Sequence, residues 1–553
     1  LIDDIDYSGQ GGIATLFDVD QVEVFRGPQG SRTGANALAG LIYIKTKDPT
    51  NEFEGTSEIT LGDYGTQNLG IAFGGPMKNE KLKYRFVLRT DYSDGFRKNL
   101  FLNKSDTSKK DELTLRYKLN WNFNKTTDIN FVISKIDMDD PADIWTIDGS
   151  LNTLSDRPGM DSQETNSYGV KVTKNFNNFD LQSFTSATKT DVIFSYDADW
   201  GNPESHFPYT YDYFSETLRK RDTFSQEIRF LSKNTDFSEK KPFEWVFGFD
   251  FSELEETNVT RDDGIYGDPS DPYGPYASES IIARNYEAKN LSLFGNIDYF
   301  LSENYKLAFG LRWENWNSKY KDSNQESFKP SDNMNGGKVS LIKNNDNTNI
   351  YLSFARGYKQ GGFNLGLDAA DNTIKDSLIY DPEFLTNYEI GINSKSNDMS
   401  FNYSAVIFFS KREDQQVLIS KQVDPTDPNT FSYLTQNAAE GENYGLEISS
   451  NYFVSDNLYL FANLGFLKTK IKNWQSRIDL QDRAQAHAPE KTYSVGMNFD
   501  VMNNFYLKFD INGKSSFYYS DSHDNKSQSY QLVNIHFGYS KDNISAELWI
   551  RNA

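Results

Sequence analysis

Apolar and polar residues alternate one by one over many stretches of this chain. The clearest stretch runs from 113 to 123. Its apolar positions are Leu113, Leu115, Tyr117, Leu119, Trp121 and Phe123, and its polar positions are Thr114, Arg116, Lys118, Asn120 and Asn122. A β-strand places such residues on two opposite faces, whereas a helix would mix them. About 11 residues also suffice for a tilted strand to cross a bilayer. The pattern predicts membrane-spanning strands.

The same alternation recurs at 129–133, 458–466 and 505–511. In the last stretch, Lys508 and Asp510 lie on the face opposite the apolar stripe. A water-filled lumen tolerates charged side chains, but the packed core of a soluble β-sandwich does not. The pattern therefore favours a membrane barrel over the alternative, a soluble all-β fold.

Connections between the predicted strands alternate between short and long. Residues 76–81, 122–127 and 454–457 are short connections, whereas Asp191–Lys220 and Glu256–Asn285 are long ones. Outer-membrane barrels have short periplasmic turns and long extracellular loops. About 21 crossings follow Phe53, and plugged transporters of this architecture have 22 strands. Since closed barrels of this type need an even number, we expect the chain to stop before a final loop and strand.

The first 50 residues have a different pattern, without long alternating stretches. A short strand at 22–25 leads into the turn Arg26–Gly30, and a Gly- and Ala-rich stretch precedes a second strand at 41–46. Glycine permits tight turns and close approach of backbones. We therefore expect a small, tightly turned unit at 1–50, ahead of a barrel at 51–553.

Composition removes several classes of function. The formal net charge of -22 disfavours nucleic-acid binding, which needs clustered Lys and Arg. Without cysteine there are no disulfides or thiolate sites, and 15% aromatic residues argue against disorder. The four histidines, His206, His487, His523 and His536, lack metal-ligand spacing, and no hydrolase or nucleotide-binding motif is present. We expect neither an enzyme nor a resident cofactor or metal.

One segment of the N-terminal unit resembles a known family. Residues 21–49 read QVEVFRGPQGSRTGANALAGLIYIKTKDP, which is similar to the end of the plug domain of TonB-dependent receptors. The matching motif residues are Arg26, Gly27, Pro28, Gly30, Gly34, Asn36 and Gly40. Weaker family-like segments occur at 355–364, 382–391 and 488–490. The chain departs from the family at Arg32-Thr33, where the family usually has an apolar and an aromatic residue.

The resemblance implies a fold and a role. The fold is all-β and transmembrane: a 22-stranded-type antiparallel outer-membrane β-barrel, with about 21 strands present and the C-terminal part of a plug domain in its lumen. The role is TonB-dependent import across the outer membrane of a Gram-negative bacterium. The partners would be TonB, outer-membrane lipid and a small solute, and we expect a monomer. The resemblance places the TonB box upstream of this chain.

The cargo remains open between several classes. A ferric siderophore is expected from the frequency of such cargo in the family, and oligosaccharide, cobalamin or another organic solute is the alternative. A passive porin or a surface adhesin is the other class of function, and the plug motif argues against it because an open pore needs no plug.

Candidate ligand-binding residues lie in the two longest connections. They are Trp200, His206, Tyr209, Tyr211, Tyr213, Tyr266, Tyr273 and Tyr276. Tyrosine offers a flat apolar face and a hydrogen-bonding tip, which suits siderophores or sugars. The alternative is that these rings only pack the loops or form the membrane-interface girdle. Asp-rich stretches at 137–140 and 262–271 raise the possibility of loop calcium, but no EF-hand pattern is present and a solvated acidic loop is preferred.

Two glutamates are candidates for holding the plug. Glu389 and Glu447 are flanked by apolar neighbours of opposite parity, so both should face the lumen. By resemblance, receptors of this family hold the plug through pairs between plug arginines and lumen glutamates. Arg26 and Arg32 are the candidates on the plug side of this latch. The alternative is that both glutamates are ordinary lumen-lining carboxylates.

Overall fold

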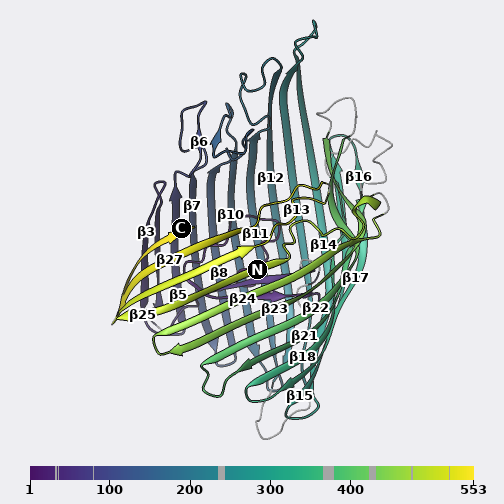
Figure 1. The fold of residues 1–553 in the computed structure, drawn as a ribbon. Helices are drawn as coiled ribbons and strands as arrows, with labels where there is room; N and C mark the ends of the chain where they lie inside the picture. Colours follow the sequence, from purple (N-terminus) through teal and green to yellow (C-terminus); the bar gives the residue numbers. More distant parts are fainter. Residues whose placement is uncertain are drawn as a thin grey trace.

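A long antiparallel sheet closes on itself to form a barrel in the computed structural model (Figure 1). The structure describes residues 1–31, 34, 37–78, 80–233, 243–364, 379–422, 431–474, 477–502, 504–521 and 523–552. Two strands precede the barrel: β1 (Val19–Arg26) and β2 (Gly40–Thr46). The strands that follow up to the middle of the chain are β3 (Glu54–Leu61), β4 (Gln67–Pro76), β5 (Leu82–Ser93), β6 (Lys98–Asn99), β7 (Lys110–Asn124), β8 (Thr127–Pro141), β9 (Asn152–Thr153), β10 (Met160–Asn175), β11 (Phe179–Asp197), β12 (Thr210–Ser232), β13 (Phe243–Gly267), β14 (Tyr276–Phe300) and β15 (Tyr305–Asp322).

The second half of the chain continues in the same way. Its elements are β16 (Ser327–Phe328), β17 (Ser331–Asn344), β18 (Thr348–Lys359), β19 (Gly362–Phe363), β20 (Ile379–Tyr380), β21 (Glu383–Lys395), β22 (Phe401–Gln422), β23 (Phe431–Ser455), β24 (Leu458–Lys472), the 3-10 helix η3 (Ile478–Leu480), β25 (Lys491–Met502), β26 (Phe505–Lys514), β27 (Tyr530–Lys541) and β28 (Ile544–Arg551). No helix among the described residues is long and apolar enough to cross a membrane.

The barrel order confirms the predicted architecture. It runs from β3 to β28 in chain order, omits the short pairs β6–β9 and β19–β20, and brings β28 next to β3. Of the 22 described strands in this order, β16 spans only two residues beside β15, which leaves 21 crossings. The residue-by-residue registers are antiparallel from β3–β4 through β27–β28. After an odd number of crossings, β3 and β28 therefore run in the same direction.

Burial along the strands is inverted relative to a soluble protein. On β15, Arg312 and Glu314 are only 3% and 2% exposed, whereas Phe309 and Leu311 are 47% and 53% exposed. The apolar residues of the alternating pattern thus cover the outside of the barrel, where lipid can solvate them, and the polar residues face inward. This confirms the lumen-facing assignment that the period-two pattern predicts.

Several strands extend well beyond the length that a bilayer needs, including β22 and β23 with 22 and 25 residues and the four consecutive strands β11 to β14. β11, β12, β13 and β14 contain 19, 23, 25 and 25 residues, and β12 and β13 rise toward the top of Figure 1. About 10 residues would suffice to span the hydrocarbon core. The sequence interpretation of Asp191–Lys220 and Glu256–Asn285 as loops was too wide. The pairs β11–β12 and β13–β14 both continue into these ranges. Water can solvate both faces of the extensions, so no apolar stripe in the sequence marks them.

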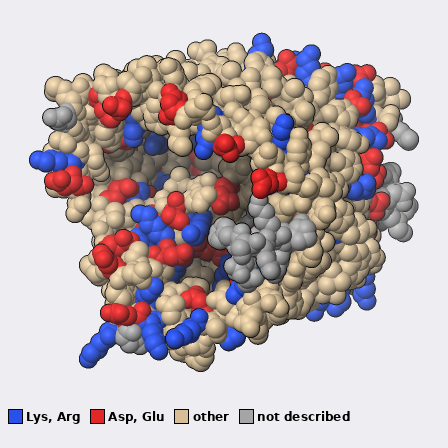
Figure 2. Space-filling view, turned by 90° about the horizontal axis from the view of Figure 1, so that it is seen from below, with Lys and Arg blue, Asp and Glu red and all other residues tan. Residues whose placement is uncertain are grey.

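The described part of the first 50 residues lies within the barrel. β1 and β2 form a separate antiparallel hairpin, drawn in purple at the centre of Figure 1. Side chains and backbone of this segment contact β7, β10, β12 and β23, which lie far apart around the barrel order. From the end with the short turns, Figure 2 shows a hollow lined by both acidic and basic residues. We refer to residues 1–50 as the plug segment.

Candidate functional site

The plug segment is fixed to one side of the barrel by its acidic residues. The Arg85 guanidinium on β5 donates two hydrogen bonds to Asp18, with Nε–Oδ2 and Nη2–Oδ1 distances of 2.8 and 2.5 Å. Both side chains are 2% exposed. Arg116 on β7 lies 3.6 Å from the same carboxylate, and Arg85 also contacts Glu54 on β3. Charge-assisted, two-pronged pairs of this kind fix orientation as well as distance.

Two further acid–base contacts extend this attachment. Lys118 Nζ on β7 lies 3.1 Å from Asp3 Oδ1 and donates to the Thr46 carbonyl oxygen at 3.0 Å. Lys171 on β10 contacts Asp4 at 2.9 Å. Burial alone would raise the pKa of Asp4, but the nearby Lys171 ammonium, together with Arg229 and the Tyr43 hydroxyl, outweighs it, so the pKa is lowered. Asp4 is therefore held as a carboxylate against the wall.

A small apolar cluster lies beside these ion pairs. Ile5, Tyr7 and Ile13 of the plug segment pack against Val132 and Ile136 of β8. Burial raises the pKa of the Tyr7 hydroxyl to about 12, so this ring stays neutral. The strand pattern places apolar residues outside, so this inward-facing group on β8 marks the place where the plug segment covers the wall.

The glycine-rich motif packs against the opposite wall, on β17 and β18. A Cβ atom built on Gly30 would lie 3.0 Å from the Arg356 carbonyl oxygen and 3.2 Å from the Gly357 Cα atom. A Cβ atom on Gly357 would lie 2.8 Å from Pro28 Cβ. The plug and wall backbones can approach this closely because neither position has a side chain. The motif thus serves as a contact surface between plug and wall.

Other motif residues have local roles. Gly27 and Gly34 have φ angles of +72° and +75°, in the left-handed region that favours glycine. A Cβ atom on Gly34 would also lie 2.4 Å from Glu314 Oε2. Gly40 begins β2, where a Cβ atom would lie 2.6 Å from the Phe25 carbonyl oxygen. Asn36 lies outside the described residues.

The structure brings one of the predicted latch pairs together. Arg26 Nη1 contacts Glu447 Oε2 on β23. Glu389 on β21 also points to the interior, where Tyr351 Oη donates to it at 2.5 Å and Asn387 Nδ2 donates at 3.2 Å. Arg32 lies outside the described residues. Arg26 and Glu447 are therefore in contact, and the role of this contact as a latch stays a prediction.

Sequence reasoning missed the larger set of plug–wall contacts because it looked for plug arginines and wall glutamates. The principal contacts have the opposite polarity, with plug aspartates on wall arginines and lysines. A signal was available in the alternating stretch 113–123, which places Arg116 and Lys118 side by side on the lumen face.

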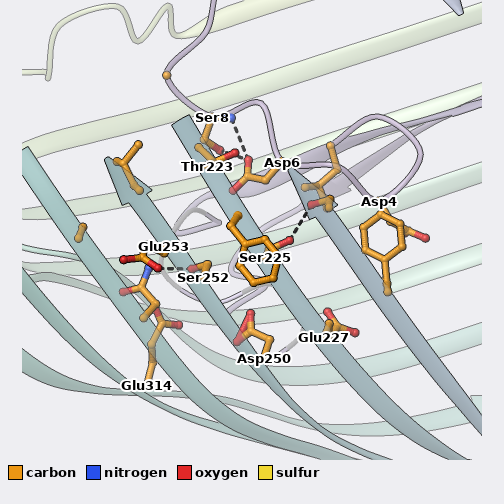
Figure 3. A pocket seen from close by; sticks show the side chains of 18 of the residues that line it. Asp4, Asp6, Ser8, Thr223, Ser225, Glu227, Asp250, Ser252, Glu253 and Glu314 are labelled. Carbon is orange, nitrogen blue, oxygen red and sulfur yellow. Dashed lines mark hydrogen bonds between the residues drawn. The ribbon is translucent and has the colours of Figure 1, made fainter. Parts of the chain in front are cut away.

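A lumen cavity of about 380 Å³ lies between the plug segment and strands β10 to β15. Figure 3 shows its lining: Asp4, Asp6 and Ser8 come from the plug segment, and hydroxyls and carboxylates of the strands face them. Most lining charges are compensated, since Asp250 contacts Arg312 at 2.7 Å and Glu227 contacts Arg229. Arg221 Nη2 donates to the Ser8 carbonyl oxygen at 3.1 Å and closes the cavity toward the plug. The lining is suited to water and to polar solutes.

The predicted aromatic residues fall into two groups at the far end of the extended strands. His206, Tyr211 and Tyr213 form one cluster, with centroid distances of 5.1 Å for His206–Tyr211 and 4.9 Å for Tyr211–Tyr213. Tyr266 on β13 joins it, 6.4 Å from Tyr211.

The other predicted rings stand apart from that cluster. Tyr273 is 85% exposed between β13 and β14, and Tyr276 Oη donates to Asp271 at 2.9 Å. Tyr209 and Trp200 are exposed in the β11–β12 connection. The cluster around Tyr211 is therefore the only compact aromatic surface that these eight predicted residues form within the described part of the chain.

No group of three or more metal-ligating side chains occurs among the described residues. Three carboxylates of the Asp-rich stretches have partners within the protein. Asp139 lies near Lys109 at 3.9 Å, Asp263 pairs with Arg157 at 2.7 Å, and Asp268 accepts hydrogen bonds from Ser270. Nearby cations and turn hydrogen bonds thus account for these carboxylates.

Comparisons with known proteins agree with this architecture. Residues 116–553 match the family model described as TonB dependent receptor-like, beta-barrel. A pesticin receptor of Yersinia enterocolitica is 22% identical over 474 residues, which cover 82% of this chain and 63% of the receptor. The chain thus spans less than two thirds of that relative's length.

Solved structures show the same fold at low sequence identity. The ferric yersiniabactin uptake receptor FyuA from Yersinia pestis superposes with a TM-score of 0.78 at 16% identity, covering 97% of this chain and 80% of that one. The siderophore receptor PiuA from Acinetobacter baumannii gives a TM-score of 0.76 at 16% identity, with 97% and 82% covered. With the family model matching most of its length, this chain belongs to the TonB-dependent receptor-like β-barrel family of the Gram-negative outer membrane.

Proposed function

We propose that residues 1–50 are the C-terminal part of a plug domain, that residues 51–553 are its barrel, and that together they form part of a TonB-dependent importer. The observation that carries the proposal is the attachment of the plug segment inside the lumen. Buried pairs such as Asp18–Arg85 hold it on one side, and Arg26–Glu447 holds it on another. A passive porin has no use for a plug with built-in contacts. TonB and outer-membrane lipid are the proposed partners, and the protein acts as a monomer.

The proposed cargo is a ferric siderophore. Two similar structures are titled as a ferric yersiniabactin uptake receptor and a siderophore receptor, and this supports the assignment by analogy. The cluster of His206, Tyr211, Tyr213 and Tyr266 at the outer end supports it chemically. Flat rings with hydrogen-bonding tips can contact the rim of a bulky, polar chelate.

An uptake assay tests both parts of the proposal, TonB-dependent import and a ferric siderophore as the cargo. The full-length receptor gene is expressed in a Gram-negative strain without its own siderophore receptors, with and without functional TonB. Cells receive radioactive iron on hydroxamate, catecholate or mixed chelators, and separate cultures receive labelled cobalamin or oligosaccharide. We expect uptake of an iron chelate only when both receptor and TonB are present.

The outcomes separate the two parts. TonB-dependent uptake of cobalamin or oligosaccharide would keep the importer and replace the cargo. Uptake that continues at the same rate without TonB would contradict the importer itself and favour a passive channel. A variant with Tyr211→Ala and Tyr266→Ala should lower the affinity for the chelate about tenfold or more, since stacked rings are worth about 0.5–1.5 kcal/mol each beyond their buried area.

A further inference from the structure

Three outer loops are joined into one unit. They are the connections at 94–109, 142–159 and 198–209, which we call the first, second and third loop. The two-residue strands β6 and β9 pair in parallel and join the first loop to the second. Asn99 Nδ2 donates to Asp143 Oδ2 at 2.9 Å, and Thr153 Oγ1 donates to the same atom at 2.7 Å. The second loop is thus tied to the first through a buried carboxylate.

The third loop is tied to the second by one backbone hydrogen bond and one hydrogen bond from a side chain. Asp156 N donates to the Gly201 carbonyl oxygen at 2.9 Å, and Asn202 Nδ2 donates to the Leu154 carbonyl oxygen at 2.9 Å. Asp199 Oδ1 accepts from Gly201 N at 2.9 Å, which shapes the third loop itself. These contacts depend on residues 154–156 and 199–202 staying in register.

The carboxylate of Asp197 lies at this junction. Asp197 ends β11 and is 5% exposed, in a small cavity that Asp143, Ser155 and Trp200 also line. Its Oδ1 accepts from Asp199 N at 3.3 Å, and no described donor reaches its buried Oδ2 with hydrogen-bond geometry. A buried carboxyl group in this position is stable when it is protonated, whereas ionising it without a partner costs free energy.

Charged groups from every neighbouring element face this junction. Asp199 lies 3.5 Å from His206 Nε2 in the third loop. Asp156 belongs to the second loop, and the adjacent Arg157 pairs with Asp263 on β13 and lies 3.6 Å from Asp212 on β12. Burial is the largest influence and raises the pKa of Asp197 to about 7. The nearby Ser155 hydroxyl, the next largest influence on this pKa, opposes the rise, and the carboxylates of Asp199 and Asp156 add to it. Arg157 is engaged by other carboxylates and does not neutralise Asp197.

We propose that Asp197 is a proton-controlled clasp, which joins the second and third loops when it is protonated and loosens them when it ionises. The direction of the pH dependence follows from the linkage between protonation of Asp197 and docking of the loops. A carboxyl group with a raised pKa in the docked state stabilises docking at low pH, and this contribution is lost as pH rises from about 4 to about 7. The second and third loops are then held together more firmly at low pH than near neutral pH.

Hydrogen exchange of the full-length receptor in detergent micelles tests the clasp. Exchange in peptides covering 142–159 and 198–209 is measured from pH 5 to pH 9 and divided by the intrinsic rate at each pH. In the wild type, the opening constant should rise about tenfold per pH unit between pH 5 and 7 and level off above. Asp197→Asn, which cannot ionise, should keep these peptides protected at every pH.

Matched variants sharpen the result. Asp148 lies exposed in the same second loop, and its pKa is lowered by hydrogen bonds from Ser150, so Asp148→Asn should retain the wild-type profile. Asp199→Asn removes a neighbouring negative charge and should move the midpoint to lower pH. Equal protection of Asp197→Asn and the wild type at pH 5 shows that the loops of the variant are folded.

Two outcomes would overturn the proposal. One is a wild-type slope in Asp197→Asn, which would assign the pH dependence to another group. The other is calcium-dependent protection of the wild type at pH 8 that a chelator removes, which would mean that a cation, not a proton, holds the carboxylates. Both readouts are independent of cargo and of TonB.

Discussion

At the scale of single residues, burial decides which plug–wall contacts contribute most to the free energy of plug attachment. The Asp18–Arg85 pair is almost fully buried, whereas the side chains of Arg26 and Glu447 are 66% and 36% exposed. An exposed ion pair contributes about 0–1 kcal/mol, because water and salt screen it. Removing one partner of a buried pair costs about 3–5 kcal/mol, because it leaves the other charge without compensation.

Asp18→Asn should therefore release the plug segment more easily. We expect protease to reach residues 1–50 at a lower urea concentration than in the wild type. The free energy of plug release should fall by about 3 kcal/mol or less, because Arg85 keeps Glu54 as a partner. Asp20→Asn is the matched control, since Asp20 makes an exposed pair with Lys45 on the same segment. Equal effects of the two variants would show that burial does not set the strength of attachment.

The Arg26–Glu447 contact is expected to act on motion more than on stability. A double-mutant cycle with Arg26→Ala and Glu447→Ala should give a coupling energy of at most about 1 kcal/mol for plug release. The same variants should change uptake or leakage of a large antibiotic while the barrel stays folded. Unchanged uptake and unchanged leakage would make both residues ordinary lining residues.

At the scale of elements, packing of the glycine motif on β18 permits a steric test. Gly357→Val would place side-chain atoms where Pro28 and the Leu38 backbone now lie. We expect the plug segment to shift and antibiotic leakage to rise, with β18 still paired to β17 and β21. Gly11→Ala is the control on the plug side, because nothing lies within 4 Å of an added Cβ atom there. Leakage from both variants alike would point to a general loss of folding.

The orientation of the strands can be tested with single cysteines, since the chain contains none. Tyr273→Cys, at the tip between β13 and β14, should react with a membrane-impermeant maleimide on intact cells. Asp346→Cys, in the short turn between β17 and β18, should react only after the outer membrane is permeabilised. Reaction of both positions on intact cells would reverse or abolish the proposed topology.

The sequence allowed the strands to be predicted better than their ends. Alternation as in 113–123 determines which residues face lipid, so the wall of the barrel follows from local pattern alone. The extensions of β12 and β13 could not be found this way, because both of their faces meet water and no apolar stripe marks them. The pairing of Asp18 with Arg85 was also beyond the sequence, because it depends on how the plug segment is rotated within the lumen.

At the scale of the whole molecule, barrel and plug segment rest on different forces. The wall is held by continuous strand pairing and an apolar exterior, and the plug segment mainly by polar contacts to that wall. Removing residues 1–50 should therefore leave a barrel that still folds in lipid, with a large increase in single-channel conductance. A barrel that fails to assemble without residues 1–50 would show that the plug segment guides closure of the sheet.

The polarity of the plug–wall contacts also bears on how such receptors exchange parts. Here the aspartates belong to the plug segment and the arginines and lysines to β5, β7 and β10. A chimera that combines this barrel with a plug carrying basic residues at positions 3, 4 and 18 would bring like charges together inside a confined lumen. The two parts must therefore change together during evolution, and recombination between relatives should succeed only at junctions that transfer both as one inherited block.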